Sequence, residues 1–351
     1  VISWLADRYA TTRTLPPVSD VDASATGVEP PPEPTDDEPE EPSYGCKPPD
    51  DDLPPANGSV HGDVRVMTID GVSYGQQAVG EFLVFENDTT VIQMRAEPAG
   101  DSQSLSLASA FAVGTGGESI AMHRGGRTYV DGELLELERG ERIRVGEAEV
   151  LWGSLDGWTI AWPDGQLVKV FDRGEVNGMS LTVQPRPGPT GAIGQLGDGD
   201  GDPDNDFRTR DGEQLDPSII EDVSLVTDLT EFYATYVDTW RITQEESLLH
   251  YDEGETTESF LIEGFPSTTV TLTDLDPDAR AEAEETCQAA SVVDERFYEG
   301  CVVDVAVTGD PGYAYDAFRV QLVTPPLEEP AAGPEPEGDD DPDVPAAGPA
   351  E

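Results

Sequence analysis

One stretch of the sequence, residues 197–207, constrains the fold more than any other. It reads G-D-G-D-G-D-P-D-N-D-F, so acidic side chains alternate with small or rigid residues. Carboxylates packed this closely repel one another, and a folded loop holds them together only with a counter-charge. A hard cation of the calcium type takes about six to eight oxygen ligands, which a loop of alternating Asp and Gly can supply. The stretch therefore predicts a calcium-stabilised fold, and the alternative is a solvated acidic turn.

The remainder of the chain is also acidic. Nineteen basic residues against 73 acidic ones give a formal net charge of −54. This charge argues against nucleic acid and anionic membranes as partners, because both require clustered Lys and Arg. Lys47 and Lys169 are the only lysines. An acid excess with so few lysines is typical of a halophilic protein, because high salt screens self-repulsion to a few ångströms; the alternative is a moderately acidic secreted protein.

The cysteines indicate the compartment. Cys287 and Cys301 flank a short predicted helical segment and can close a loop of about 15 residues, worth roughly 3 kcal/mol of stability. Such a disulfide suits an oxidising, extracellular location. Cys46 would then be free, lie in a mobile tail or pair with another chain. No apolar run approaches the roughly 20 residues of a spanning helix, and because the sequence starts at Val1 we expect a processed, excised or fragmentary chain.

Two acidic, Pro-rich segments flank the central part of the chain. Residues 15–60 read as a linker, and residues 325–351 as a disordered tail with nine acidic residues and no basic one. Such compositions favour extended backbone and do not bury a core. Residues 1–14 differ because their apolar side chains recur at helical spacing, so we predict a short helix or docking peptide there.

Residues 61–216 are predicted to form a mainly β domain, either an antiparallel β-sandwich or a strongly curved sheet. Short runs of β-branched and aromatic residues alternate with turn signals, including Asp-Gly dipeptides at 70, 131, 156 and 164. The predicted strands are 64–69, 81–85, 91–96, 104–113, 119–123, 142–152, 158–162, 167–171 and 179–184. Many short strands with close turns favour this class of fold.

Residues 217–324 are predicted to form a small α-helical subdomain after the β domain. Aromatic and aliphatic residues recur at helical spacing between 229 and 240. A second helix is expected at 279–290, carrying Cys287, and a third at 294–301.

Four stretches in the expected order resemble the von Willebrand factor type D domain. Residues 62–74, G-D-V-R-V-M-T-I-D-G-V-S-Y, are similar to its opening, G-D-P-H-F-x-T-x-D-G-x-x-Y, and residues 78–84 to its second strand. Residues 197–207 resemble its calcium loop. The Cys-bearing stretch that ends at 302–310 resembles the segment that follows this domain in bacterial secreted members. The resemblance covers residues 60–318 or so.

The resemblance implies a set of calcium ligands. Family sites use the Asp of the first D-G turn, the first and third positions of the loop, and the acidic or amide pair that closes it. In this sequence the matching residues are Asp70, Asp198, Asp200, Asn205 and Asp206, with Asp202 fitting by its charge. The family often has Asn where Asp198 stands, so this site is expected to need its cation more strongly.

Other residues carry weaker signals. Two sequons make Asn57 and Asn87 glycosylation candidates. His61, His123 and His250 lack zinc-ligand spacing, and no G-x-S-x-G elbow is present, so we expect no enzyme. A secreted enzyme remains the alternative if His123 or His250 lies in a cleft within hydrogen-bond reach of a Ser and an Asp. His61 is expected to be exposed.

Three tryptophans, Trp152, Trp158 and Trp162, fall on one predicted hairpin. We expect them to pack in the core, and the alternative is an exposed aromatic platform for a sugar or a protein.

Together these features predict an extracellular or cell-surface adhesive module that binds other proteins or copies of itself and is stabilised by calcium. The alternative is a structural subunit of a filament, sheath or surface layer, assembled through residues 1–14.

Overall fold

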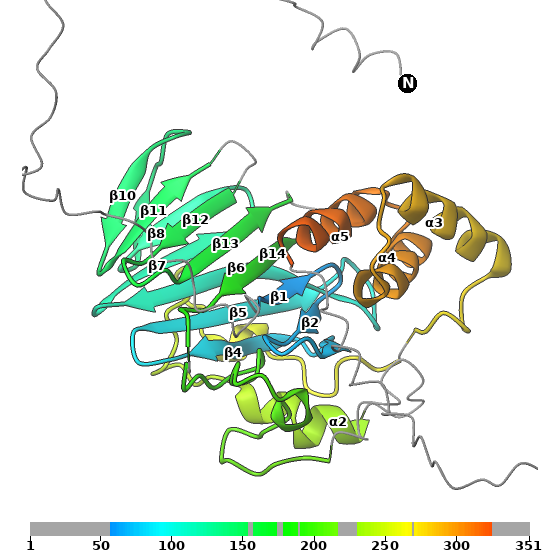
Figure 1. Ribbon diagram of the computed structural model, residues 1–351, viewed down its shortest axis with the longest axis horizontal. Coiled ribbons are helices and arrows are strands. Elements are labelled where there is room, and N and C mark those ends of the chain that lie inside the picture. The colour runs from blue at the N-terminus through cyan, green and yellow to red at the C-terminus, as the bar shows by residue number, and fades with distance from the viewer. Residues whose placement is uncertain are drawn as a thin grey trace, which may run out of the picture. The chain divides into compact units, whose positions relative to one another are not determined.

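The computed structural model describes residues 57–153, 157–173, 178–188, 190–216, 230–268 and 270–324. In these ranges the chain forms two antiparallel β-sheets of eight and six strands, followed by helices toward the C-terminus (Figure 1). The predicted fold class, mainly antiparallel β with a C-terminal helical part, is confirmed. No helix in the described ranges is long and apolar enough to cross a membrane.

The larger sheet joins the first strands of the domain to its last. Its order is β10-β11-β12-β13-β14-β1-β2-β3. The strands are β1 (Gly58–His61), β2 (Arg65–Met67), β3 (Ser73–Gly75), β10 (Arg142–Val145), β11 (Ala148–Trp152), β12 (Gly157–Ala161), β13 (Leu167–Asp172) and β14 (Met179–Gln184). Because β1 pairs with both β14 and β2, the start and the end of the β region lie side by side.

The smaller sheet is a meander in which each strand pairs with the next along the chain. Its strands are β4 (Gly80–Glu86), β5 (Thr90–Pro98), β6 (Ser106–Thr115), β7 (Glu118–His123), β8 (Arg127–Val130) and β9 (Glu133–Leu135).

The main core lies between the two sheets, where alternate side chains point inward. Along β13, for example, Val168 and Val170 are fully buried while the intervening Lys169 is half-buried. Trp158 and Trp162 are also buried, and their indole N–H groups donate to the hydroxyls of Thr128 (3.0 Å) and Thr115 (2.9 Å) on the opposite sheet. The core-packing interpretation is therefore confirmed for these two tryptophans, while Trp152 is half-buried against Trp158.

The helices fall into two groups. The first group is α2 (Thr230–Thr235), η4 (Val237–Trp240) and η5 (Thr257–Phe260). Of these, η4 and η5 contact the smaller sheet, α2 contacts β3 through Phe232 and Tyr233, and buried residues of α2 and η4 complete the main core. A second group, α3 (Pro277–Ala289), α4 (Glu295–Thr308) and α5 (Gly312–Val323), forms a second core together with Met67 of β2 and Leu107 of β6. The disulfide between Cys287 and Cys301 joins α3 to α4, as their spacing indicated.

The structure departs from several strand predictions. Residues 142–152 form the hairpin β10–β11 rather than one strand, because Gly146 (φ 53°) turns the chain and leaves no room for a side chain against Thr115. Strand β1 lies in the predicted linker, and β3, β8 and β9 were not predicted. His61, expected to be exposed, is 3% exposed because β1 places it beneath α4, where its ring contacts Phe297.

Residues 1–14, residues 325–351, Cys46 and nearly all of 15–60 lie outside the described ranges. The predictions made for them, and the domain boundaries drawn from them, stay predictions.

Candidate calcium site

The acidic loop begins where the two sheets are joined by backbone hydrogen bonds. After β14 the chain runs along the edge of β4, where Ile193 pairs with Glu86 and the N–H of Leu196 donates to the carbonyl of Val84 (3.0 Å). The carbonyl of Leu196 in turn accepts from the N–H of Ile69 in the β2–β3 turn (2.8 Å). The loop 197–207 therefore starts beside Asp70, as the resemblance implied.

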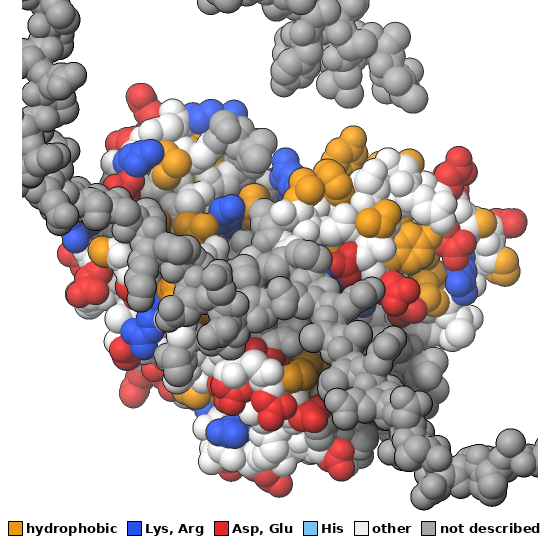
Figure 2. All heavy atoms as spheres, in the orientation of Figure 1, with side chains coloured by type: hydrophobic (Ala, Val, Ile, Leu, Met, Phe, Trp, Pro, Cys, Tyr) orange, Lys and Arg blue, Asp and Glu red, His pale blue; other side chains and the backbone are white. Residues whose placement is uncertain are grey.

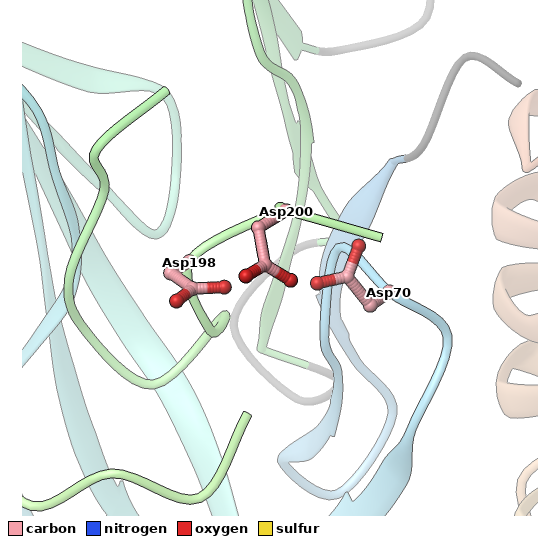
Figure 3. A group of neighbouring side chains, drawn as sticks. All are labelled: Asp70, Asp198 and Asp200. Carbon is pink, nitrogen blue, oxygen red and sulfur yellow. The ribbon is translucent and has the colours of Figure 1, made fainter. Parts of the chain in front are cut away.

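Three carboxylates converge at this point, and we call them the loop cluster: Asp70, Asp198 and Asp200. One oxygen from each lies within 4.8 Å of the others. In Figure 3 the carboxylate of Asp200 lies between those of Asp198 and Asp70, and Asp70 comes from the β2–β3 turn while the other two come from the loop. Asp70 Oδ1 also accepts from the N–H of Gly201 (3.0 Å), which fixes the turn against the loop.

Glycine permits the close approach of the loop to its surroundings. Gly197 adopts a left-handed conformation (φ 74°), and a Cβ there would collide with the carboxylate of Asp206. Gly199 (φ 66°) faces Ile69, whose Cγ2 would lie 2.9 Å from an added Cβ. Only glycine meets both requirements at low cost, which explains the alternation of Gly with Asp.

The residues that close the loop lie beside the cluster. Asp206 is 2% exposed, and its Oδ2 accepts from the hydroxyl of Thr68 (2.6 Å). Asn205 donates from Nδ2 to Asp200 Oδ2 (3.1 Å). Thr68 precedes the Asp-Gly turn and was not singled out in the sequence, since nothing about a strand threonine marks it as a partner of a distant carboxylate.

Asp202, a predicted ligand, is used differently. Its side chain is exposed, and Oδ1 accepts from the N–H of Asp204 (3.1 Å), so that it caps the short helix η3 (Pro203–Asn205). The loop cluster does not include it.

Burial and mutual repulsion both raise the pKa of the acids at this site. Burial is the larger cause at Asp206, where the pKa rises to about 8 despite the hydrogen bond from Thr68. Burial also raises the pKa of Asp70 and of Asp198, and the carboxylate of Asp200 raises both further. These acids are therefore difficult to ionise together without a cation.

Four oxygen atoms at this site are buried and accept no hydrogen bond within the described ranges. They are Asp70 Oδ2, Asp198 Oδ1, Asn205 Oδ1 and Asp206 Oδ1. Buried polar atoms in native proteins nearly always have a partner, and an unpaired acceptor is costly. All four are hard oxygen donors of the kind that calcium binds, so the residues present fit this cation.

The glycosylation candidates differ in their surroundings. Asn57 is half-buried directly before β1, and Ser59 of its sequon is fully buried. Asn87 lies in the β4–β5 turn, where its Nδ2 donates to Gln166 (2.8 Å) and its Oδ1 accepts from the N–H groups of Thr89 and Thr90. A glycan on Asn87 would replace the contact to Gln166.

The two histidines considered for catalysis lie together on the smaller sheet. His123 is 6% exposed, and burial, followed by the charge of Arg95, lowers its pKa to about 3. Their ring centroids are 6.1 Å apart, and both rings contact Tyr129, on which the ring of His250 stacks with a centroid distance of 3.7 Å. In the described ranges neither ring hydrogen-bonds to a serine hydroxyl.

Comparison with known proteins gives one relative. The chain is 27% identical over 281 residues to "Sushi domain-containing protein 2" from Homo sapiens. The alignment covers 73% of this chain but 31% of that protein, so the chain spans about a third of the relative's length. No family model matches the sequence.

Proposed function

We propose that this chain is an extracellular, non-catalytic interaction module of the von Willebrand type D kind, stabilised by calcium. The observation that carries the proposal is the set of four buried acceptor oxygens on the loop and the β2–β3 turn, none of which has a donor in the described ranges. The ligands would be Asp70, Asp198, Asp200, Asn205 and Asp206, and the cation would supply the missing positive charge.

The role of the cation in this proposal is structural. The loop cluster combines one residue from the β2–β3 turn of the larger sheet with two from a loop that runs along the smaller one. A cation held there would fix the two sheets relative to each other. Partners are proposed to be other proteins or further copies at a cell surface.

The extracellular assignment is supported by two observations. The Cys287–Cys301 disulfide suits an oxidising compartment. The relative from Homo sapiens is named for containing a Sushi domain, and we extend from it only the expectation of an interaction module.

The decisive experiment compares thermal melts in EDTA and in millimolar calcium for the wild type, Asp200→Ala and Asp204→Ala. Asp204 is exposed in the same loop, and its carboxylate is outside the loop cluster, so it is the matched control for lost charge. Calcium at about a hundredfold above its Kd stabilises by roughly 2.7 kcal/mol. We expect this shift in the wild type and in Asp204→Ala, and its loss in Asp200→Ala.

If calcium does not shift the melting temperature of the wild type, the loop is a solvated acidic turn and the proposal fails. An equal loss of the shift in both variants would show that net loop charge, rather than ligand geometry, controls binding.

The proposal of a halophilic protein rests on the net charge of −54. Repulsion of this size is screened over about 3 Å at molar salt, so we expect low salt to unfold the protein even in calcium. An unchanged melting temperature between dilute buffer and molar salt would contradict it. The structural-subunit alternative depends on residues 1–14, outside the described ranges, and stays a prediction.

A further inference from the structure

A layer of charged residues lies between the helical unit α3–α5 and part of the larger sheet. We call it the charged layer and define it as Asp63, Arg65, Arg173, Asp304 and Asp316. Asp63 follows β1, Asp304 belongs to α4 and Asp316 to α5, and these three are 1%, 3% and 1% exposed. The apolar cluster of the helices reaches the sandwich through Met67 and Leu107, and the charged layer forms the other part of the contact.

One arginine holds two of the carboxylates. Arg65 donates from Nη2 to Asp304 Oδ1 (3.1 Å), and its Nε lies 3.4 Å from Asp63 Oδ1. The backbone N–H of Asp63 also donates to Asp304 Oδ2 (3.3 Å). Contact across the layer is close, because a Cβ on Gly62 would collide with Asp304 and one on Gly300 with Arg65.

The other half of the layer is centred on Asp316. Its Oδ2 accepts from the hydroxyl of Ser180 (2.6 Å) and from the N–H of Gly62 (3.3 Å), and its Oδ1 lies 3.3 Å from Arg173 Nε. The guanidinium of Arg173 also lies over the ring of Tyr313.

The layer has one negative charge too many, because three carboxylates face two guanidinium groups. His61 does not balance it, since burial lowers its pKa to about 4 and keeps it neutral. Tyr233 of α2 and Tyr313 of α5 also stay neutral, because burial raises the pKa of both. Neither carboxylate oxygen of Asp63 accepts a hydrogen bond within the described ranges.

A proton supplies the missing charge. Burial, and the facing carboxylate of Asp304, raise the pKa of Asp63 well above its ordinary value although Arg65 opposes the rise. A protonated Asp63 can donate to Asp304, which satisfies both groups and brings the layer to neutrality.

We propose that the charged layer is a proton-dependent latch: Asp63 and Asp304 share one proton when the helical unit α3–α5 is docked, and loss of that proton as the pH rises releases the helices from the sheet. The latch is independent of the proposed calcium site. Asp63 precedes β2 whereas Asp70 follows it, and the two sites share no residue.

The direction of the pH dependence follows from linkage. Because the pKa of Asp63 is higher in the docked state than in the free one, docking is strongest below the ordinary value of 3.8 and weakens as the pH rises through the raised pKa. His61, whose pKa is lowered by docking, gives the opposite slope and does so only below its ordinary value of 6.5. Docking that weakens as the pH rises therefore identifies Asp63 as the responsible group, and docking that strengthens identifies His61.

Hydrogen exchange of the full chain between pH 5 and 9, corrected for intrinsic rates and held in saturating calcium, tests the latch. One linked proton changes the opening equilibrium by at most about tenfold per pH unit. We expect protection in α4 and α5 to fall by up to this factor, while amides of the central strands β5 and β6 keep theirs.

Asp63→Asn imitates the protonated acid and should abolish the slope in α4 and α5; Asp304→Asn provides a second variant should the first fail to fold. Glu299→Gln, an exposed charge on α4, should leave the slope intact. Three results would overturn the latch: protection of α4 and α5 that does not change with pH in the wild type, a pH dependence retained in both Asn variants, or an equal fall of protection in β5 and β6. None of these results bears on the calcium proposal.

Discussion

The loop cluster and the charged layer both gather carboxylates, but they balance the charge differently. In the charged layer each enclosed acid lies beside an arginine, and one proton accounts for the remaining charge. In the loop cluster none of the three acids forms an ion pair with an arginine of the described ranges, and Asp200 is exposed to solvent. The charged layer is neutralised mainly by arginines of the fold itself, with one proton in the proposed latch, whereas we propose that the loop cluster depends on a cation from solution.

The difference shows why acid clusters of similar composition respond to different conditions. A guanidinium cannot be removed by dilution, so the charged layer responds to pH alone. A cation in an open loop exchanges with solution, so the loop cluster should respond to calcium concentration and to competing protons. A substitution in one cluster should therefore leave the response of the other unchanged.

The largest effect is expected from Arg65→Met. Removal of one partner from a buried ion pair leaves an uncompensated charge and costs roughly 3–5 kcal/mol, and here two carboxylates lose the same partner. Urea unfolding should show the same loss of unfolding free energy in calcium as in EDTA. The control is Arg208→Met, because Arg208 is an exposed arginine near Asp198, and it should change stability little. If calcium restored the stability of Arg65→Met, the charged layer and the loop cluster would not be independent.

Asp206→Asn is expected to have a smaller effect on stability, and the sign of that effect should differ between buffers with and without calcium. Without calcium the substitution removes a buried acid whose carboxylate accepts a hydrogen bond from Thr68 alone among the described residues, so the variant should melt at or above the wild-type temperature. With calcium it removes a proposed ligand and part of the roughly 2.7 kcal/mol of ligand stabilisation. Melts at pH 8 in EDTA and in calcium measure both, and the same sign in both buffers would argue against Asp206 as a ligand.

The metal-free wild type should also lose stability as the pH rises. The pKa of Asp206 is raised from 3.8 to about 8 in the folded state, so its contribution is complete below about pH 4 and is lost by about pH 8. Denaturant midpoints in EDTA at pH 5, 6.5 and 8 should fall in that order, and Asp206→Asn should flatten the series. A midpoint that rises with pH in EDTA would be inconsistent with the raised pKa.

The smallest effect is expected from Asp202→Ala. Loss of a helix N-cap costs about 1 kcal/mol, and the cap of η3 is the one role that the structure gives this side chain. The loss should be equal in calcium and in EDTA. A larger loss in calcium would return Asp202 to the ligand set.

The strands and the position of the acidic loop could be predicted because their signals are local, whereas calcium binding by the loop stays a proposal. Alternation of buried and exposed residues marks a strand such as β13 within six positions, and Asp-Gly alternation marks the loop within eleven. The short strand β1 was missed because Gly58–His61 follows a long acidic stretch and is held by pairing with β14, more than a hundred residues away.

The charged layer could not be predicted for the same reason. Asp63 and Asp304 are 241 residues apart, and nothing distinguishes them in the sequence from the other acidic residues among 73. Burial alone makes these acids unusual, and burial depends on how the helices pack on the sheet. The loop ligands come from only two short segments, whereas the layer draws on four.

The position of Asp70 and the loop has a mechanical consequence. Asp70 and its backbone partner Gly201 are 131 residues apart, and the chain between them includes β3 to β14. A cation bridging the two would close this chain into a ring, so that tension applied at the two ends of the domain would pass through the ion first. The ring holds roughly 430–470 Å of extended chain, which would be released only once calcium dissociates. Extracellular calcium would then set the force at which the molecule lengthens.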